Sequence, residues 1–397
     1  AFIYIKLTFP KWRQEATLNA ERLDPSKLYI LATFFRIKTE IAARVMHSII
    51  QESLNVKLPV MIVLSIVEAQ DEELILNILS AYELPENIVI HIVRVEGKGK
   101  RYGLAQGMRT ISRDMPDDDA LCLIMDGDTI LMPDCLKKSI PFFKMMPEMG
   151  ALTTDEISIV EGHRVMRDWY DLRFAQRHLL MSSISLSKRV MTLTGRMSIF
   201  RANIVTSPDF IQHMEEDYLD HWRLGKIRFL TGDDKSSLYY LMQKGYEQIY
   251  LPDVQVITLE DPPSHNFLQA STALMMRWFG NMLRTNARIL KLGIDKMPFF
   301  VWWSFLDQRL SMWTTFCGPV FACLLSLRYG PTFFLYYFAW VGIVRGVMSL
   351  ELFLARPSIT WRYPFLLYYN QVYAAIVKTW MLFNLDRQIW TRQKTRL

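Results

Sequence analysis

The stretch LCLIMDGDTILMP, residues 121–133, joins an apolar run directly to two carboxylates, Asp126 and Asp128. The apolar run shows no alternation of polar and apolar side chains, which is typical of a strand covered on both faces in a parallel sheet. In open sheets of this kind, ligands bind at the carboxyl ends of the strands. We therefore expect ALCLIM (120–125) to be a buried strand that carries both aspartates to a ligand-binding edge.

Three similar apolar runs come before this one, and helical stretches separate them. LYILATFF (28–35), VMIVLSIV (60–67) and IVIHIVRV (88–95) are rich in Ile, Val and Leu. Residues 38–53 and 71–84, which lie between them, have apolar residues at helical spacing. Alternating strands and helices predict an α/β domain with a parallel sheet and right-handed crossovers.

The C-terminal part of the chain has a different composition. Residues 309–326 carry one charge, at Arg309, and residues 329–344 and 363–377 carry none. Each stretch approaches the roughly 20 residues that an apolar helix needs to cross a bilayer. Trp, Tyr, Arg and Lys gather at their ends, as interfacial anchors do. We expect three membrane helices; long helices buried in a protein core are the alternative.

A few charged and aromatic residues near these stretches bear on topology. Arg345 and Glu351, inside or at the edge of the second span, could line a polar channel or form a pair at the interface. The basic tail DRQIWTRQKTRL (386–397) predicts a cytoplasmic end. Three spans would place that tail on the outside, so we expect a further interfacial or re-entrant segment. The short aromatic stretch MPFFVWWSFL (297–306) is the candidate.

The composition of the 397-residue chain excludes several classes of protein. Its net charge of +6 is modest and its C-terminal region is lipid-like, so we expect no nucleic-acid partner. The four cysteines are too few and too scattered for a disulfide framework and have no zinc-site spacing, which predicts buried reduced thiols. The first residues, AFIYIKLTF, lack the layout of a secretory signal and could be the end of a membrane helix.

The two aspartates of the opening stretch have the chemistry of a metal site. They are two residues apart, so strand alternation places both side chains on one side, and Gly127 leaves room for a close approach. Neighbouring carboxylates repel each other, and hard oxygen ligands suit Mg²⁺ or Mn²⁺. Because a lone D-x-D pair is more often an exposed acidic turn, the hypothesis depends on the motifs around it.

Two further motifs carry charges that suit phosphate and sugar chemistry. EGKGKRYGLAQGM (96–108) places Lys98, Lys100 and Arg101 among glycines, where they could enclose a diphosphate or form a solvated basic turn. TGDDKSSLYYLMQKG (231–245) places Asp233 and Asp234 directly before a helix. These carboxylates could cap the helix or take a proton from a sugar hydroxyl, and Asp234 could do both.

In chain order, GKGKR (97–101), DGD (126–128), GDD (232–234) and MMRW (275–278) resemble the motif series of membrane-integrated, processive family 2 glycosyltransferases. Cellulose, hyaluronan and chitin synthases belong to this family. The resemblance implies a GT-A (Rossmann-like) glycosyltransferase domain followed by interfacial and transmembrane helices. The corresponding segments are an N-terminal membrane or linker segment (1–26), the GT-A domain (27–265), interfacial helices with the Arg-Trp motif (266–306), and transmembrane helices with a basic cytoplasmic tail (307–397).

Within this family, GKGKRYGLAQGMR, LTGRMSIFR, TGDDKSSLYYLM and RWFGNMLRTN are most similar to the members that make alginate. This narrower resemblance implies an inverting enzyme that polymerises GDP-mannuronate into β-1,4 polymannuronate and passes the growing polymannuronate chain across the lipid bilayer. It places the protein in the bacterial inner membrane as a multi-pass protein with a cytoplasmic catalytic domain. It also implies a separate membrane co-polymerase subunit that reads cyclic di-GMP. RQKTR (392–396) has the spacing of a cyclic di-GMP reader, but chance in a basic tail explains it better.

The resemblance also implies roles for the acidic and basic motif residues. Asp126 and Asp128 would hold Mg²⁺ or Mn²⁺, which neutralises the nucleotide diphosphate, and Lys98, Lys100 and Arg101 would bind that diphosphate. Asp234, with Asp233 beside it, would be the catalytic base on the acceptor hydroxyl.

The Arg-Trp motif departs from the family pattern in one position. Arg277 would hold the departing diphosphate and Trp278 would stack on the acceptor sugar, although such a pair could also be an interfacial anchor. The Gln of the family's Q-x-x-R-W motif falls at Leu274, and Gln269 is out of register. The role of that Gln must be absent or supplied elsewhere.

Further candidates for acceptor and nucleotide binding are less specific. Gly195 and Arg196 lie in TLTGRMSIFR, which faces the acceptor end in relatives, and Arg196 could meet a sugar carboxylate. Glu68 lies where the family often has acidic residues and could accept hydrogen bonds from guanine, with Thr33 and Arg36 as further nucleotide contacts.

Some alternatives remain open. Asp71 and its neighbours, beside Glu68, could equally serve only to cap a surface helix. For the whole chain, the alternatives are a membrane polysaccharide synthase that uses a UDP-sugar and a non-catalytic scaffold or export subunit with the same fold.

Overall fold

The computed structural model describes residues 1–160, 164–228, 230–358 and 360–388. The chain forms two compact units. Unit 1 contains Ala1–Ile157, Met181–Tyr218 and Arg228–Leu259, and unit 2 contains Ser158–Leu180, Leu219–Ile227 and Glu260–Leu397.

Unit 1 is built on an eight-stranded mixed sheet with the strand order β3-β2-β1-β4-β7-β6-β10-β5. The four strands expected from the sequence are present and mutually parallel, which confirms the α/β prediction: β1 (Leu28–Phe34), β2 (Val60–Ile66), β3 (Ile88–Arg94) and β4 (Leu121–Asp126). Four more strands extend the sheet: β5 (Thr129–Leu131), β6 (Met149–Val160), β7 (Ser198–Arg201) and β10 (Glu247–Glu260). β4 pairs with β7 in antiparallel fashion, so the parallel half ends beside the strand that carries the aspartates.

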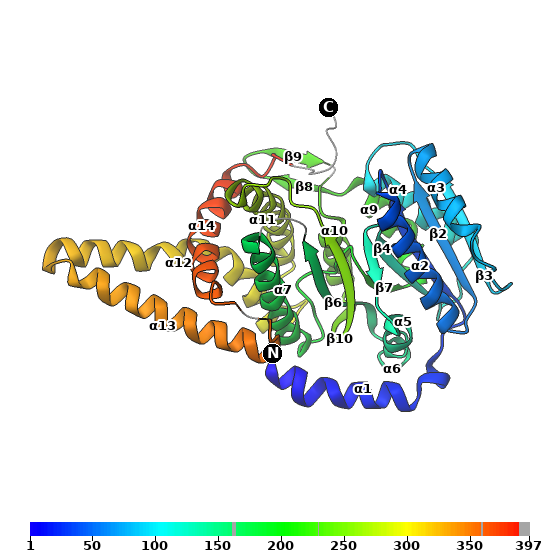
Figure 1. Ribbon diagram of the computed structural model, residues 1–397, viewed down its shortest axis with the longest axis horizontal. Helices are drawn as coiled ribbons and strands as arrows, with labels where there is room; N and C mark the ends of the chain where they lie inside the picture. Colours follow the sequence, from blue (N-terminus) through cyan, green and yellow to red (C-terminus); the bar gives the residue numbers. More distant parts are fainter. Residues whose placement is uncertain (161–163, 229, 359, 389–397) are drawn as a thin grey trace. The chain divides into compact units, whose positions relative to one another are not determined.

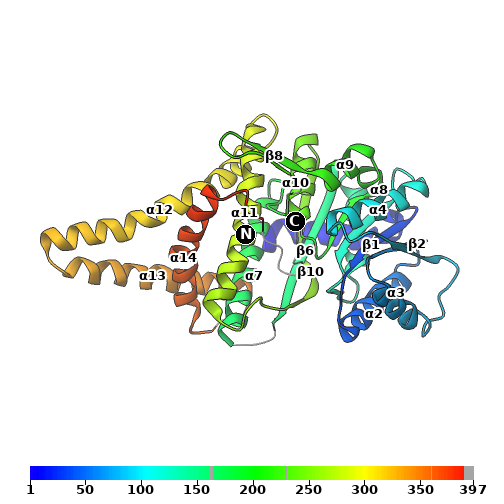
Figure 2. The same ribbon diagram turned by 90° about the horizontal axis from the view of Figure 1, so that it is seen from above.

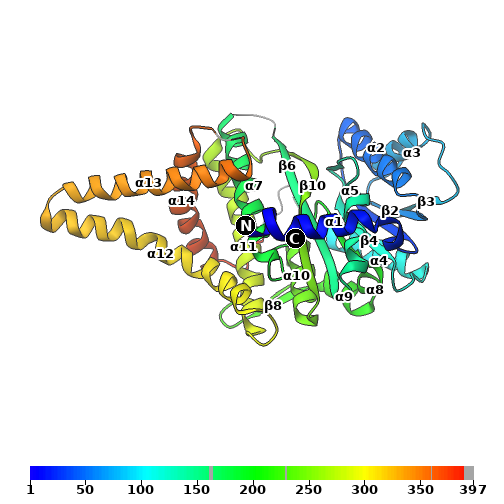
Figure 3. The ribbon, with the colours of Figure 1, turned by 90° about the horizontal axis from the view of Figure 1, so that it is seen from below.

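Helices cover both faces of β1, β2 and β4, which explains why those strands are apolar along their length. β3, at the edge of the sheet, is only partly covered, so the expectation of two covered faces is wrong for this strand. α2 (Thr39–Asn55) and α3 (Ala69–Leu79) lie on one face, and α4 (Lys100–Arg113) lies on the other (Figures 2 and 3). Every residue of β2 is buried, and every residue of β4 is buried up to Asp126. A strand with two covered faces gains from apolar residues at every position rather than at alternate ones.

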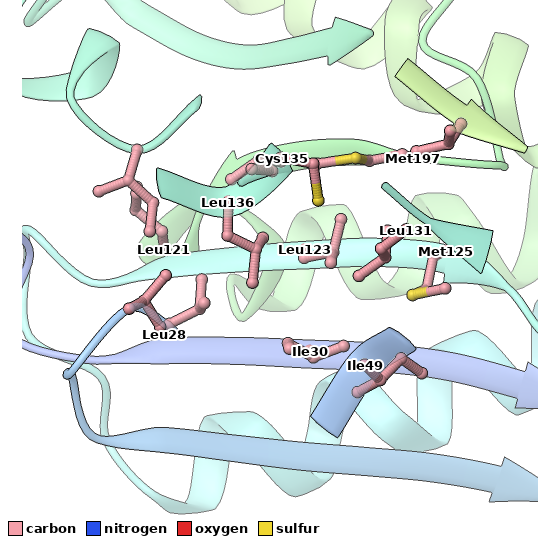
Figure 4. Packing of buried hydrophobic residues seen from close by; sticks show 14 of the residues in the cluster. Leu28, Ile30, Ile49, Leu121, Leu123, Met125, Leu131, Cys135, Leu136 and Met197 are labelled. Carbon is pink, nitrogen blue, oxygen red and sulfur yellow. The ribbon is translucent and has the colours of Figure 1, made fainter. Parts of the chain in front are cut away.

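The core of unit 1 lies between the sheet and α2 (Figure 4). Leu121, Leu123 and Met125 alternate along β4 and share one face, where Ile30 of β1 and Ile49 of α2 belong to the same cluster. Each of these side chains is almost fully shielded from water. The well-packed end of β4 therefore gives the acidic turn that follows it a rigid support.

The other helices of unit 1 are shorter than α2 and α4. They are α1 (Phe9–Leu18), α5 (Cys135–Ser139), α6 (Phe142–Met145), α8 (Ala202–Val205), α9 (Pro208–Glu216) and α10 (Asp233–Lys244). A separate two-stranded sheet consists of β8 (Tyr218–His221) and β9 (Gly225–Arg228), and most of its residues belong to unit 2. Ahead of α1, Tyr4–Thr8 form a π-helical turn, and Tyr4 and Phe9 are buried in the core of unit 1.

Unit 2 is helical. Its main elements are the first part of α7 (Arg164–Ser185), α11 (Phe267–Lys291), α12 (Phe299–Tyr329), α13 (Thr332–Ala355) and α14 (Tyr363–Phe383). α12 and α13 form a long antiparallel hairpin, visible in yellow and orange in Figure 1. α14 packs against α11, α12 and α13.

Two helices in the described part of the chain are long and apolar enough to cross a membrane: α12, with 31 residues, and α13, with 24 residues. Residues 363–377, the third predicted span, form most of α14, which contains Asn370, Gln371 and Lys378 and is not one of these two helices. The third span therefore stays a prediction. The aromatic stretch 297–306 is also not a separate segment, because α12 continues from Phe299 through it without interruption.

Arg345 on α13 has a partner on α14 rather than Glu351. Its guanidinium donates to Gln371 Oε1 and lies 2.7 Å from Met348 Sδ, whereas Glu351 is exposed. The contact with Gln371 accounts for the position of the Arg345 charge. An interfacial pair with Glu351 or a place in a channel lining is not needed to explain it. The RQKTR stretch and most of the basic tail lie outside the described residues.

All four cysteines are free, as predicted. Cys122 and Cys135 are buried in unit 1, but Cys317 and Cys323 are exposed on α12. The prediction that the thiols are buried is therefore wrong for the last two, because the surface of this apolar helix is uncovered in the chain by itself.

Candidate active site

The acidic turn lies at the carboxyl end of β4, pressed against β1. Asp126 is the last residue of β4 and is paired in register with Thr33 of β1. A Cβ atom at Gly127 would lie only 2.5 Å from the Thr33 carbonyl oxygen. The backbone of β1 thus occupies the space where a side chain at position 127 would lie. Glycine at this position lets the turn between Asp126 and Asp128 pack directly against β1.

We expect Gly127→Ala to lower both stability and activity. The added methyl group forces the turn away from β1, which destabilises by about 1–3 kcal/mol in a packed region and displaces both aspartates. Gly103→Ala on α4 is the matched control, because its nearest contact would be an ordinary 3.7 Å to Ser65 Cβ. Thermal unfolding and catalytic activity, measured on both variants, test this; equal melting temperatures would contradict it.

Lys100 joins three motifs that are far apart in the sequence. It is the first residue of α4, and its Nζ lies 2.6 Å from Asp126 Oδ1 and 2.6 Å from Asp233 Oδ2. Gly195 lies against the same group, because a Cβ there would be 3.2 Å from both Lys100 Nζ and Asp126 Oδ2. The basic loop, the D-x-D turn and the G-D-D turn therefore meet at one ammonium group.

The electrostatics of this cluster follow from burial and close charges. Burial raises the pKa of Asp126 to about 6, with Lys100 opposing the shift and Asp128 and Asp233 adding to it. Burial would also raise the pKa of Asp233, but the Lys100 ammonium holds it below its usual value. For Lys100, burial is outweighed by Asp126 and Asp233, so its pKa is raised and it stays charged. One ammonium thus faces several carboxylates.

Asp234 points to a different partner from Asp233. α10 begins at Asp233, and Gly232 occupies the N-cap position with a positive φ of 92°. Since the capping position is glycine, neither aspartate is the helix cap. Asp234 Oδ2 accepts a hydrogen bond from Thr192 Oγ1 at 3.1 Å and remains partly exposed. Both carboxylates lie in the first turn of α10, near the positive end of the helix dipole.

The other two basic residues of the loop have contrasting environments. Arg101 is buried, and its guanidinium donates to the Met214 carbonyl at 2.7 Å, to Ser236 Oγ at 2.6 Å and to the Leu230 carbonyl. These bonds tie α4 to α10, so Arg101 positions the start of the helix that bears Asp233. Lys98 is exposed and pairs with Glu96 Oε2 at 2.6 Å. Exposed pairs of this kind are weak, so Lys98 can exchange that partner for a ligand.

The candidate nucleotide contacts lie together at the ends of β1 and β2. The Arg36 guanidinium donates to Glu68 Oε1, with distances of 3.0 and 3.1 Å, and its backbone N–H donates to Asp71 Oδ2 at 2.7 Å. Asp71 therefore fixes the loop after β1, in which Arg36 has a positive φ of 50°, instead of only capping α3. Thr33 lies on β1 between Ser65 and Asp126 in register.

Arg196 has a carboxylate partner within unit 1. Its Nη1 lies 2.8 Å from Glu156 Oε2, and its Nε donates to Thr258 Oγ1 at 3.0 Å. The Glu156 side chain is fully buried, so this pair compensates a charge in the protein interior.

The Arg-Trp motif lies on α11 in unit 2. The Trp278 ring stacks on Trp169 of α7, with ring centroids 5.7 Å apart and planes 22° apart. Arg173 Cζ lies 4.2 Å from the Trp278 ring centroid, and Arg277 Cζ lies 6.0 Å away. Leu274 is buried, and Gln269 is bonded to Ser264 near the start of α11. Sequence reasoning missed Trp169 and Arg173, although their i, i+4 spacing on a helix was a signal.

Asp126 and Asp128 fit a divalent cation that arrives with a phosphate ligand. Among the described residues, no group of three or more His, Cys, Asp or Glu side chains is arranged to hold a metal ion. A cation that requires a complete protein cage would not bind such a pair. Mg²⁺ commonly uses one or two carboxylates and completes its shell with substrate phosphates and water. The excess of carboxylates over Lys100 supplies the negative potential for it.

A parallel sheet with an Asp-x-Asp turn at its edge, extended by mixed strands and followed by apolar helices, defines a glycosyltransferase of the GT-A type. Residues 29–281 match the family described as "Glycosyltransferase like family 2". The chain belongs to this family, and the protein is a glycosyltransferase.

Two curated relatives match the chain over its whole length. The "Glycosyltransferase alg8" of Pseudomonas syringae pv. tomato is 45% identical over 395 residues, covering 100% of this chain and 80% of the relative. The "Glycosyltransferase alg8" of Azotobacter vinelandii is 43% identical over 395 residues with the same coverage. Among solved structures, the mannosyltransferase PcManGT from Pyrobaculum calidifontis, in complex with GDP-Man and Mn²⁺, has a TM-score of 0.52 at 16% identity. That alignment covers 95% of this chain and 98% of PcManGT, and it shows a common fold.

Proposed function

We propose that this enzyme is a processive, inverting glycosyltransferase that polymerises mannuronate from GDP-mannuronate into β-1,4 polymannuronate. The observation that carries the proposal is the identity of 45% and 43% over the full chain with two glycosyltransferases named alg8. The complex of the fold neighbour with GDP-Man and Mn²⁺ supports a guanine nucleotide donor and a divalent cation. The two apolar helices support passage of the product across a lipid bilayer.

The donor binds at the carboxyl edge of the parallel strands. Asp126 and Asp128 hold Mg²⁺ or Mn²⁺, which supplies positive charge to the diphosphate. Thr33, Arg36 and Glu68 contact the nucleoside, and Glu68 exchanges its bond with Arg36 for the guanine N–H donors. Lys98 and Arg277 contribute further positive charge to the diphosphate, since guanidinium and ammonium groups bind phosphate strongly.

Transfer itself requires one base and one leaving group. Asp234 removes the proton from the 4-hydroxyl at the non-reducing end of the chain while that oxygen attacks the anomeric carbon. The new C–O bond forms as the bond to the phosphate oxygen breaks, and GDP leaves with the electron pair. Attack from the opposite face turns an α-linked donor into a β linkage. Thr192, which donates to Asp234, orients the carboxylate for this step.

Two residues are assigned to the acceptor, each from its surroundings in its own unit. In unit 2, Trp278 offers a flat apolar surface that suits a sugar ring. In unit 1, Gly195 leaves the space beside Asp126 and Lys100 open. Arg196, bonded to Glu156, keeps the loop that contains Gly195 in place.

Removal of divalent cations should abolish transfer. Without a cation, the diphosphate would enter a site rich in carboxylates, and repulsion would weaken donor binding by at least tenfold, which is about 1.4 kcal/mol. Washing membranes with EDTA and assaying labelled sugar incorporation checks this, with Mn²⁺ or Mg²⁺ added back as the control. Undiminished transfer in EDTA would show that Asp126 and Asp128 have no metal role.

The donor is tested by giving membranes that contain the protein GDP-mannuronate, GDP-mannose or a UDP-sugar side by side. Only GDP-mannuronate should yield a polymer, and an alginate lyase should digest it. A lyase-resistant polymer made from a UDP-sugar would replace the proposal with another polysaccharide synthase. Absence of any polymer from active-site-intact protein that is properly assembled would favour an export or scaffold subunit.

The cellular setting follows from the same proposal. The proposed enzyme lies in the bacterial inner membrane with its catalytic domain in the cytoplasm, where nucleotide sugars are made. A separate membrane co-polymerase subunit that reads cyclic di-GMP is its expected partner. Copurification of such a subunit with the full-length enzyme, and stimulation of transfer by cyclic di-GMP only when it is present, tests this part.

A further inference from the structure

Three helices of unit 2 bring two cations and three aromatic rings together. Trp169 and Arg173 are one turn apart on α7, so they share a face. Arg173 Cζ lies 5.1 Å from the Trp169 ring centroid and 4.2 Å from that of Trp278 on α11. Next to Trp278 along α11, the Phe279 ring centroid lies 5.0 Å from Lys378 Nζ of α14.

Arg173 has an unusual set of contacts for a guanidinium. In the described ranges of the chain it makes no hydrogen bond and no ion pair, and its contacts are two indole rings. Burial lowers the pKa of Arg173 to about 10. Indole faces attract a cation, but they offer no acceptor for the five N–H donors of the guanidinium. Its side chain is nevertheless partly exposed, so a ligand can reach these donors.

Lys378, like Arg173, is a cation whose pKa is lowered by burial. Burial, and then the positive charge of Arg173, lower the pKa of Lys378 to about 8. The Asp307 carboxylate on α12 opposes this shift but forms no ion pair with Lys378 within the described residues. Arg173 and Lys378 are thus two partly exposed cations close enough to repel each other. An anion bound beside both would relieve this repulsion.

The scaffold around these cations is held firmly by polar bonds. Trp169 Nε1 donates to Asn370 Oδ1 of α14 at 2.7 Å, and Arg362 Nη1 lies 2.6 Å from Asp168 Oδ2. Asn370 and Lys378 are eight residues apart on α14, so they share a face of that helix. The rings and the cations are therefore arranged before any ligand arrives, which reduces the entropy lost on binding.

We propose that Arg173 and Lys378 form a subsite for the carboxylate of a uronosyl unit in the growing chain, whose sugar ring lies on Trp278. A flat apolar surface beside two unpaired cations matches a ligand that combines a pyranose ring with a carboxylate. A neutral sugar would leave both cations without an anion, so the subsite selects uronate acceptors. This inference rests on the proposed function, and a diphosphate is the other anion that two cations could bind.

Binding to the full-length protein in detergent distinguishes these ligands. The probes are mannuronate oligomers, neutral β-1,4-mannose oligomers of equal length, and GDP. We expect mannuronate oligomers to bind wild-type protein at least tenfold more tightly than the neutral oligomers. Arg173→Gln and Lys378→Gln should each remove about a tenfold part of that affinity, because each deletes one charge-assisted contact, and should leave GDP binding unchanged.

The matched control is Arg167→Gln, which removes an exposed positive charge from the same helix as Arg173. It should bind all three probes like the wild type. Arg173→Lys, which keeps the charge, should retain binding of mannuronate oligomers within about threefold. Without ligand, the Gln variants should keep or raise the melting temperature, because each removes a desolvated and unpaired charge. A purely structural role would instead lower the melting temperature and weaken all probes together.

Three outcomes would contradict the proposed subsite. These are equal affinity of wild-type protein for mannuronate and neutral oligomers, wild-type affinity in both Gln variants, and a loss of GDP binding that matches the loss of oligomer binding. Each can occur while membranes still make a lyase-sensitive polymer from GDP-mannuronate, in which case only this inference fails. If no such polymer forms, the proposed function fails first, so the two failures are distinguishable.

Discussion

Asp234→Asn is expected to abolish incorporation of labelled sugar while nucleotide binding persists. Asparagine keeps the shape of the side chain and can still bond to Thr192, but it cannot accept a proton at neutral pH. General base catalysis is worth about 10²- to 10⁴-fold in rate, so residual transfer should fall by at least a hundredfold. Donor affinity should change little, because Asp233, not Asp234, contacts Lys100.

Asp209→Asn is the control for this variant. Asp209 also lies in the first turn of a helix of unit 1, α9, and it is exposed. The substitution therefore removes the same charge at a helix start without touching the candidate site. Purified full-length variants can be compared by single-turnover transfer and by GDP binding. Transfer at the wild-type rate in Asp234→Asn would remove Asp234 as the base.

Lys100→Met is expected to cause the largest combined loss of stability and activity. The ammonium is 2.6 Å from both Asp126 and Asp233, and no ion pair of either carboxylate within the described residues is shorter. Removing one partner of a fully buried ion pair costs about 3–5 kcal/mol because the remaining charge is left uncompensated. The loss here should be smaller, because the side chains of Lys100, Asp126 and Asp233 are 20%, 30% and 13% exposed. Methionine fills a similar volume, so the effect reports the charge more than the packing.

Thermal unfolding of the full-length protein in detergent measures this effect, with sugar transfer as the second readout. Lys98→Met serves as the stability control, since Lys98 is exposed and pairs only with Glu96 through a solvated contact. We expect a lower melting temperature for Lys100→Met and an unchanged one for Lys98→Met. Equal melting temperatures for the two variants would mean that the bridge between the three motifs contributes nothing to folding.

The strands of the parallel half could be predicted because their signal is local. β1, β2 and β4 are apolar at almost every position, and that pattern follows from helices on both faces. The position of Asp126 at a strand end also followed from its place after an apolar run. The sequence motifs also indicated the family, which the match over residues 29–281 confirms.

The arrangement of charges inside the site could not be predicted, because it depends on contacts between distant segments. In the sequence, Lys100 and Arg101 look like equivalent members of a basic loop. In the structure, Lys100 is the counter-ion of two aspartates, and Arg101 is buried in bonds to Met214 and Ser236. Adjacent residues at the start of a helix point about 100° apart, so small differences in helix start decide which one faces the site.

The polar character of α14 also differs from the expectation, and the composition of this segment contains a signal for it. Asn370, Gln371 and Lys378 lower the apolar character of α14, and each has a contact within the helical unit. The assignment of Ser158–Leu180 to unit 2 had no such signal, because nothing in the chain order indicates that this segment packs with the C-terminal helices. Trp169 and Arg173 were missed for that reason, because their i, i+4 spacing indicates that they share a helix face but not what that face contacts.

The double contact of Lys100 has a consequence for how substitutions combine. A change at Asp126 alters the field felt at Asp233, and the reverse is also true, since one ammonium serves both. Asp126→Asn and Asp233→Asn should therefore show strong epistasis, unlike pairs of distant sites, whose effects usually add within about 0.5 kcal/mol. We therefore expect the tolerance for a substitution in the loop after β3, the turn after β4 or the start of α10 to depend on the residues present in the other two segments.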